Sequence, residues 1–465
     1  MTSTSAALRW LERLGPTWAN VWRWVLFAAG VALAVYFLLV RGLVHDAIPA
    51  FVIAGLVIGA ALTMRVSMAI PLMATPVLFV VTRLGFGGID LTVSDAALAA
   101  AFGTAVLLGT RPFSRELRAL LWCNAVYQFA TVLTVIVNPY IQNTVEWFHA
   151  WLLVSGALVM GWALGSAGYA RLALRLMVTA AVVIAIGTFA TGAVQYVHGD
   201  FVGVYPTWPF AMHKNFAGTV MAFAALIVYI NPDWARCAKN PRRALMITLI
   251  VAILMTQSRQ ALIGLMIAIV LVVSRRRLSG HSRAVLLLLI PATWMIISMV
   301  NDQIQSQNKF NSVFQRLDWL RELYAYWKHS PIFGHGLRFW YVDPTIHYQP
   351  PQGEVEVLVS AGIVGLLGFA IMWVGMIIVL WRMDPVYGTL AATVVISRLV
   401  QGQFDLFWVS SQVSIPFVIA GICLGAKAWV ERHPPSMVQG AAFPGTFVTT
   451  ALPLSGLHRA SRDRL

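Results

Sequence analysis

Charged residues are scarce in this chain. They make up 11% of its 465 residues, whereas a soluble domain carries roughly a quarter. Apolar residues make up 59%, which is more than the core of one soluble chain can bury, so lipid must solvate the remainder. The composition therefore excludes a soluble globular protein and predicts an all-α, polytopic membrane protein.

Cysteines are also few. Cys123, Cys237 and Cys423 lie far apart and in no metal-ligand spacing, which argues against a disulfide framework or a cysteine metal site. The chain also lacks a phosphate-cradling glycine loop, a nucleotide fingerprint and an internal repeat, so an ATP-driven or inverted-repeat transporter has no positive support. No signal peptide with a cleavage site precedes the first apolar run.

Acidic residues are outnumbered by basic ones, and the net charge is +15. Such an excess suits either a nucleic-acid partner or basic cytoplasmic loops, and the position of the charges decides between them. Apolar runs predict about fourteen transmembrane helices. They lie near 25–40, 47–64, 67–82, 94–109, 119–137, 147–165, 174–195, 215–230, 243–256, 260–274, 284–300, 355–381, 386–401 and 410–426.

With the N-terminus inside, most Lys and Arg residues fall in cytoplasmic segments, and the short outer loops are nearly free of them. This asymmetry predicts a multi-pass protein of the cell membrane with both termini in the cytoplasm, and it removes the need for nucleic acid. The predicted parts are a cytoplasmic N-terminus (1–24), helices one to eleven (25–300), an extracytoplasmic loop (301–354), helices twelve to fourteen (355–426) and a disordered cytoplasmic tail (427–465).

The predicted outer loop 301–354 contains one amphipathic segment, 316–328. Its apolar residues recur at helical spacing opposite charged ones, which predicts a helix that lies on the outer membrane face or caps the bundle. Pro331 ends this helix, and Gly334 and Gly336 form a tight turn.

Several charged residues gather on the predicted outer side, where each is costly unless it is paired or functional. Arginine reads phosphate oxygens bidentately, and a His or Glu can take a proton from a hydroxyl. Taken singly, Arg398 also fits a snorkelling interface anchor, and the histidines fit ordinary loop residues. The candidates for binding a diphosphate are Arg259, Arg316, Lys214, Arg338 and Arg398, and the candidate bases are His347, His335 and Glu354.

An anionic substrate at the outer face must be supplied without nucleotide sugars or ATP. An activated donor carried by a lipid, such as a polyprenyl diphosphate sugar, meets this condition. Membrane lipids and a lipid-linked glycan are therefore the expected partners.

Four short motifs stand in order around the outer loop, within about 255–370. They are Ser258–Leu262, Arg316–Trp319, Pro331–Leu337 and Leu358–Leu366. This order and spacing resembles the O-antigen ligase and O-antigen polymerase family of bacterial membrane glycosyltransferases.

The resemblance implies extracytoplasmic glycosyl transfer from a polyprenyl-diphosphate-linked glycan to a glycan or lipid-linked acceptor, without a metal or other cofactor. The family's Ser-Arg arginine maps onto Arg259, and its loop arginine maps onto Arg316. Lys214 supplies a further expected positive charge.

One position departs from the family pattern. The family commonly has His-Asn about eleven residues before its Gly-Ile-x-Gly stretch, and this chain has Pro351-Gln352 there. His347, His335 or Glu354 would then act as the base. This difference favours a polymerase or a related transferase over a ligase.

Two other classes remain open on the sequence. One is a transporter or flippase of lipid-linked glycans or small anions, which would need paired charges near the middle of the membrane. The other is a scaffold in a polysaccharide assembly complex, in which Arg259 and Arg316 would be replaceable.

Overall fold

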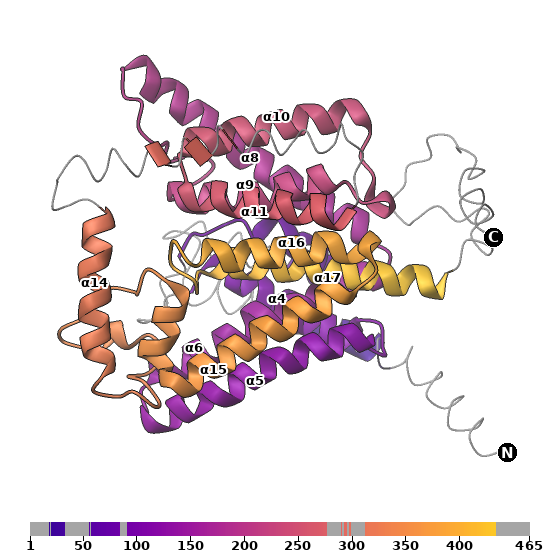
Figure 1. Ribbon diagram of the computed structural model, residues 1–465. Coiled ribbons are helices and arrows are strands. Elements are labelled where there is room, and N and C mark those ends of the chain that lie inside the picture. The colour runs from indigo at the N-terminus through magenta and orange to yellow at the C-terminus, as the bar shows by residue number, and fades with distance from the viewer. Residues whose placement is uncertain are drawn as a thin grey trace, which may run out of the picture.

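The computed structural model describes residues 18, 20–32, 55, 57–83, 91–276, 290, 293–294, 297–298 and 312–433. Apart from one isolated β-bridge between Arg83 and Thr92, these residues form helices, turns and loops (Figure 1). The predicted all-α class is therefore confirmed for the described residues.

The long helices pack side by side in a bundle (Figure 1). The helical elements include α3 (Ala69–Val77), α4 (Val93–Leu108), α5 (Arg115–Val137), α6 (Ile141–Trp151), a π-turn (Leu152–Gly156), α7 (Ala157–Ser166), α8 (Ala170–Val197), α9 (Lys214–Ile230), α10 (Lys239–Thr256), α11 (Arg259–Arg276), α14 (Ser312–Trp327), α15 (Gly353–Arg382), α16 (Pro385–Gln401) and α17 (Ser410–Arg432).

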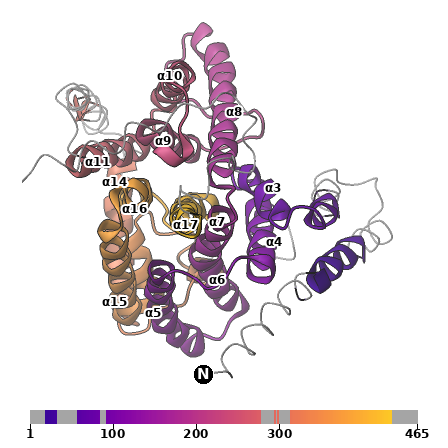
Figure 2. The same ribbon diagram turned by 90° about the vertical axis from the view of Figure 1, so that its right-hand side faces the viewer.

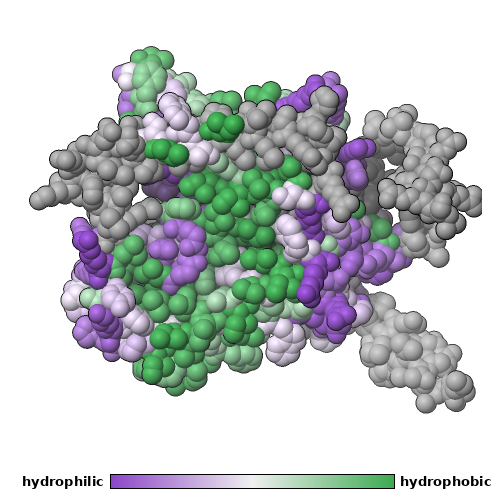
Figure 3. Space-filling view, viewed as in Figure 1, coloured by the Kyte–Doolittle hydropathy of each residue, from purple (hydrophilic) through white to green (hydrophobic). Residues whose placement is uncertain are grey.

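Among the described residues, five helical segments are long and apolar enough to cross a membrane: Arg115–Val137, Ile141–Ser166, Ala170–Val197, Gly353–Arg382 and Ser410–Arg432. Val93–Leu108 and Lys214–Ile230 are shorter apolar helices. On the view in Figure 3, hydrophobic surface crosses the middle of the molecule and hydrophilic residues gather at its two ends, which is the pattern of a membrane-embedded bundle.

The predicted spans from 94 to 274 and from 355 to 426 each coincide with a helix. The predicted span 67–82 is helical only over Ala69–Val77, and α17 runs to Arg432, six residues past the predicted boundary at 426. About half of the predicted spans 25–40 and 47–64 is described, and it is helical over 25–32 and 57–63. Most of the predicted span 284–300 and the tail beyond residue 433 lie outside the described residues.

Helix α17 lies at the centre of the bundle beside α7 (Figure 2). Glycines allow the close approach: a Cβ on Gly161 would stand 2.1 Å from the Val418 carbonyl oxygen, and one on Gly421 would stand 2.3 Å from that of Leu158. Gly165 and Gly425 continue the contact one turn further on. Small residues at this spacing are how membrane helices pack in the absence of a hydrophobic driving force.

The loops at one end of the bundle are tied together by basic side chains, and we call this the basic end. Lys427 pairs with Glu116, and Arg432 donates to the Ser166 carbonyl at 2.7 Å. Arg171 donates to the Arg236 carbonyl at 2.8 Å, and Arg275 donates to that of Met383 at 2.7 Å.

The opposite end, which we call the loop end, carries the segments 138–140, 198–213, 257–258, 328–352 and 402–409. Helix α14 lies there, steeply inclined to the bundle helices (Figure 1). Its Leu323 is fully buried and packs with Phe339, Ile346 and Val359. Tyr324 on the same helix is 55% exposed.

Helix α15 is interrupted at Gly362, where φ is 66° and ψ is −167°. The interruption frees backbone groups that the turn after α14 satisfies. Ile363 N–H donates to the Pro331 carbonyl at 2.9 Å, while the N–H groups of His335 and Gly336 donate to the carbonyls of Val359 and Ser360 at 3.0 and 2.9 Å. The segments Pro331–Leu337 and Leu358–Leu366 are therefore joined by backbone hydrogen bonds, and we call this contact the joint.

Gly362→Ala should break this joint. Its backbone conformation is essentially restricted to glycine and costs other residues about 1–3 kcal/mol. An added Cβ would also stand 2.1 Å from the Ile332 carbonyl oxygen. We expect a clear loss of thermal stability in detergent. The matched control is Gly103→Ala on α4, where nothing lies within 4 Å of the added Cβ, and it should be neutral or slightly stabilising.

Candidate functional site

Two cations meet at the loop end. Lys214 is the first residue of α9 and Arg259 the first residue of α11, and the two helix starts are in contact, because Gln260 Nε2 donates to the Asn215 carbonyl at 3.4 Å. Each stands at a helix N-terminus, where the macrodipole and the first backbone N–H groups favour an anion. Two helix starts and two cations at one place form an electropositive site.

The hairpin between α10 and α11 holds Arg259 at this end. Gln257 takes the left-handed conformation with φ 49°, and Arg259 begins the next helix two residues later, as the short apolar runs predicted. The Gln257 side chain donates to the Phe201 carbonyl at 3.0 Å. The hairpin is therefore fastened to the segment 198–213.

The same segment positions Lys214. A Cβ on Gly203 would stand 2.7 Å from the Thr256 carbonyl oxygen and 2.9 Å from the Lys214 Nζ, so glycine at this position lets the segment lie against both the hairpin and the lysine. The ammonium lies 5.6 Å from the centre of the Tyr205 ring, a cation–π arrangement. Next to it, Asn215 donates to an Asp405 carboxylate oxygen at 3.0 Å.

Arg398 is completely buried inside the bundle. Its guanidinium donates to Gln412 Oε1 and to the Leu406 carbonyl, both at 2.9 Å, and to the Phe407 carbonyl. Arg398 therefore holds the segment 402–409 in place through two of its backbone carbonyls. This position differs from the diphosphate-binding role and from the interface anchor that the sequence suggested, because burial removes the side chain from both ligand and interface.

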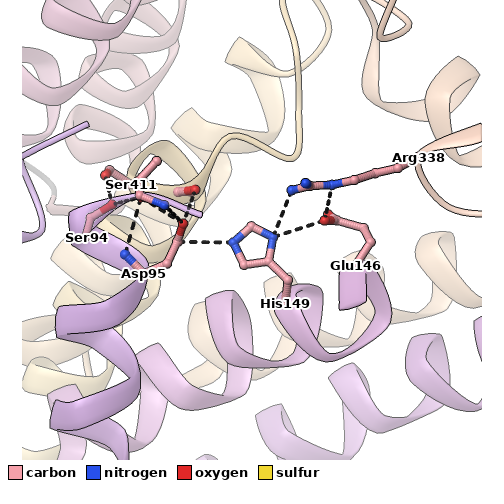
Figure 4. Close-up of polar contacts among 8 residues, drawn as sticks. Ser94, Asp95, Glu146, His149, Arg338 and Ser411 are labelled. Atoms are coloured by element: carbon pink, nitrogen blue, oxygen red, sulfur yellow. Dashed lines mark hydrogen bonds and ion pairs between the residues drawn. The ribbon is translucent and has the colours of Figure 1, made fainter. Parts of the chain in front are cut away.

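Arg338 begins a buried chain of charged residues (Figure 4). Its Nε pairs with Glu146 Oε2, and the same oxygen lies 3.1 Å from His149 Nδ1. His149 Nε2 lies 3.1 Å from Asp95 Oδ1. The four side chains come from the α14–α15 loop, α6 and α4, and those of His149 and Asp95 are each only 3% exposed.

His149 has a carboxylate at each ring nitrogen. A neutral imidazole carries one N–H and can donate to only one of them, whereas the doubly protonated ring donates to both. With His149 charged, two cations balance two carboxylates. A buried charge set is tolerated when it is paired and hydrogen-bonded in this way.

Polar groups surround Asp95, the last of these four charged residues. Ser410 donates to Asp95 Oδ2 at 2.9 Å, and Thr92 donates to the same oxygen from both its N–H and its hydroxyl. Thr92 and Asp95 also form the capping box of α4. Asp95 is thus fixed by its own helix start and by the first residue of α17.

Sequence reasoning missed Asp95, Glu146 and His149. The spacing Thr92-x-x-Asp95 is a capping-box signature, and Glu146 and His149 stand three residues apart at the edge of an apolar run, which places them on one helix face. These signals were present, but nothing in the sequence indicated that the two helix starts meet.

The candidate bases lie in different surroundings. His335 is half-buried, with Nε2 3.0 Å from the Tyr326 carbonyl and its ring stacked on Tyr326 at 3.9 Å. Burial lowers its pKa below the usual value. His347 is exposed at the loop surface. Arg316 lies in α14.

Glu354 lies next to the Pro351-Gln352 position. Gln352 is the N-cap of α15, and its Nε2 lies 3.5 Å from Gln403 Oε1. Gln403 in turn donates to Glu354 Oε1. Of the three candidate bases, Glu354 is the one tied to the Pro351-Gln352 position.

The segment 402–410 connects the separate parts of the site. Gln403 contacts Glu354, Asp405 contacts Asn215 beside Lys214, and Ser410 contacts Asp95. The cation pair, the candidate base and the buried charge chain therefore border one segment at the loop end.

Comparison with known families adds one finding. Residues 244–370 match the family described as O-antigen ligase. The matched region contains Arg259, α14, Arg338 and the joint at Gly362. No curated protein matches the chain. The match over 244–370 supports assigning this chain to the O-antigen ligase family.

Proposed function

We propose that this protein transfers a glycan at the outer face of the cell membrane, from a polyprenyl-diphosphate-linked donor to a glycan or lipid-linked acceptor, and so polymerises or ligates a surface polysaccharide. The observation that carries the proposal is the meeting of Arg259, inside the O-antigen ligase match, with Lys214 at two helix N-termini. A diphosphate is the ligand that this charge arrangement suits.

In the proposed reaction, the acceptor hydroxyl oxygen bonds to the anomeric carbon of the donor, and the bond from that carbon to the diphosphate oxygen breaks. Lys214 and Arg259 stabilise the charge that develops on the leaving diphosphate, which is the largest catalytic contribution expected from fixed cations. Glu354 is the proposed base that takes the hydroxyl proton. Arg316 on α14 is a further proposed cation.

Arg338 is proposed to face the same substrate from the loop. Its side chain is 13% exposed and forms an ion pair with Glu146. Its backbone is in the left-handed conformation, with φ 58°. The chain Asp95–His149–Glu146 would then fix the direction of its guanidinium and so act through Arg338 rather than on the substrate itself.

The transporter alternative is weakened by the position of the buried charges. A transport path needs paired charges near the middle of the membrane, whereas Asp95 stands in the first turn of α4 and Glu146 near the start of α6. Both are close to the loop end, and Arg338 joins them to the loop. This placement favours a role in positioning loop residues such as Arg338 over a transport path through the membrane.

Deleting the gene should distinguish the two versions of the reaction. If the protein is a polymerase, cells should accumulate lipid-linked single repeat units. If it is a ligase, they should accumulate long chains that remain unattached to their acceptor. Both products can be separated by size on a gel and assigned by their lipid content. Normal surface polysaccharide in the deletion strain would refute both versions.

A further inference from the structure

An apolar cavity of about 470 Å³ lies beside the site, between α3, α4, the segment 55–59 and Pro209–Phe210. Its size falls in the usual range for small-ligand pockets, roughly 300–1,000 Å³. The lining is almost entirely aliphatic, aromatic or glycine. It includes Gly59, Val77, Ala96, Ala97, Ala100 and Phe210.

Small residues create this hollow. Ala96, Ala97 and Ala100 lie on one face of α4, opposite Gly59. A cavity with this lining does not hold ordered water well, because water needs about 2–4 polar partners. Within an apolar helix bundle, the occupant that fits is a hydrocarbon chain.

The cavity is connected to the cation pair through one short segment. Pro209 and Phe210 belong to 198–213, which leads directly into Lys214. Lys214 is five positions after Pro209, and a chain of that length spans at most about 18 Å even when fully extended. Here it is folded back, with Met212 N–H donating to the Pro206 carbonyl at 3.0 Å.

Charge decides between the possible lipids. A phospholipid phosphate in a diester carries a single negative charge, whereas a diphosphate monoester carries more than one and better matches two cations at two helix N-termini. We propose that the cavity binds the first isoprene units of a polyprenyl chain whose diphosphate lies at Lys214 and Arg259. This inference rests on the proposed function and adds the place of the lipid tail.

The test uses the purified full-length chain in detergent with three probes: geranylgeranyl diphosphate, inorganic diphosphate and geranylgeraniol. Ala100→Phe fills the cavity from α4. We expect it to weaken geranylgeranyl diphosphate binding at least about tenfold, because buried apolar area contributes to affinity in proportion to its size. Inorganic diphosphate binding should not change.

The matched control is Ala99→Phe, because Ala99 is the exposed neighbour on the same helix and does not line the cavity. It should bind all three probes as the unmodified protein does. If Ala100→Phe fails to fold, Ala97→Phe provides a second blockade. A geranylgeranyl probe with a photoreactive group should label α4 in the unmodified protein and lose that label in the filled variant.

Equal affinity for diphosphate with and without the isoprenoid chain would overturn the tail site. So would equal weakening by Ala99→Phe, or competition by dioleoyl phosphatidylglycerol at the same affinity as the isoprenoid. The proposed function fails differently. In that case inorganic diphosphate binding would be absent or unaffected by Lys214 and Arg259 substitutions, while geranylgeraniol would still depend on Ala100.

Discussion

Replacing Arg259 with alanine should lower the rate of glycan transfer about a hundredfold or more. Removing one preorganised group that stabilises developing charge typically costs 10²–10³ in rate, and ~1.4 kcal/mol corresponds to a factor of ten. The protein should still accumulate in the membrane, because Arg259 is only half-buried at the start of α11. The measurement is transfer from a lipid-linked donor at matched protein levels.

Arg259→Lys separates a ligand contact from a simple helix-end anchor. Lysine keeps the charge but loses the planar fork that binds phosphate oxygens bidentately, so strong impairment should remain. Arg321→Ala is the control at the same end of the molecule, because Arg321 is 81% exposed and pairs only weakly with Asp318. Near-normal turnover of the lysine variant would reduce Arg259 to an anchor.

Breaking the buried charge chain should have the second large effect, this time on stability. Glu146→Gln removes the carboxylate that faces both Arg338 and His149. Removing one partner of a buried ion pair costs about 3–5 kcal/mol, because the other charge stays buried without compensation. We expect a matching fall in the unfolding free energy and faster hydrogen exchange in the loop around Leu337–Tyr341.

The Lys427–Glu116 pair at the basic end provides the control. Its side chains are 24% and 27% exposed, and pairs open to solvent contribute about 0–1 kcal/mol. Lys427→Ala should therefore cost little and leave the loop protected. Combining Glu146→Gln with Arg338→Gln should cost less than the sum of the two single changes, since the substitutions share one interaction. Additive costs would show that the two residues act separately.

Much of the bundle was predictable because lipid imposes a simple rule. Long apolar runs must form helices in a membrane, and α8 and α15 follow that rule closely. The turn after α14 was also predictable, because Pro331, Gly334 and Gly336 are residue types that end helices and form tight turns. The short α3 was not predictable, because an apolar run does not reveal where a helix gives way to a turn.

The candidate site was only partly predictable. Arg259 and Lys214 stood out because each charge borders an apolar run. The chain from Asp95 to Arg338 depends on the contacts of His149 with Asp95 and of Glu146 with Arg338. These pairs are so far apart in the sequence that no local pattern encodes them. Arg398 shows the opposite error: its sequence position looked like an interface, yet tertiary packing placed it deep inside, where it supports a neighbouring segment.

The joint between Pro331–Leu337 and the break in α15 limits how this protein can be recombined with its relatives. Its hydrogen bonds run between backbones, but its fit depends on glycines on both sides: a Cβ on Gly334 would stand 2.4 Å from the Ser360 carbonyl oxygen, and one on Gly362 would stand 2.1 Å from that of Ile332. A chimera that exchanges only the loop 328–352 would bring one of the two contacting surfaces without the other. Grafts that exchange 331–366 as one piece keep both surfaces, so that stretch is the smallest unit suited to transplantation.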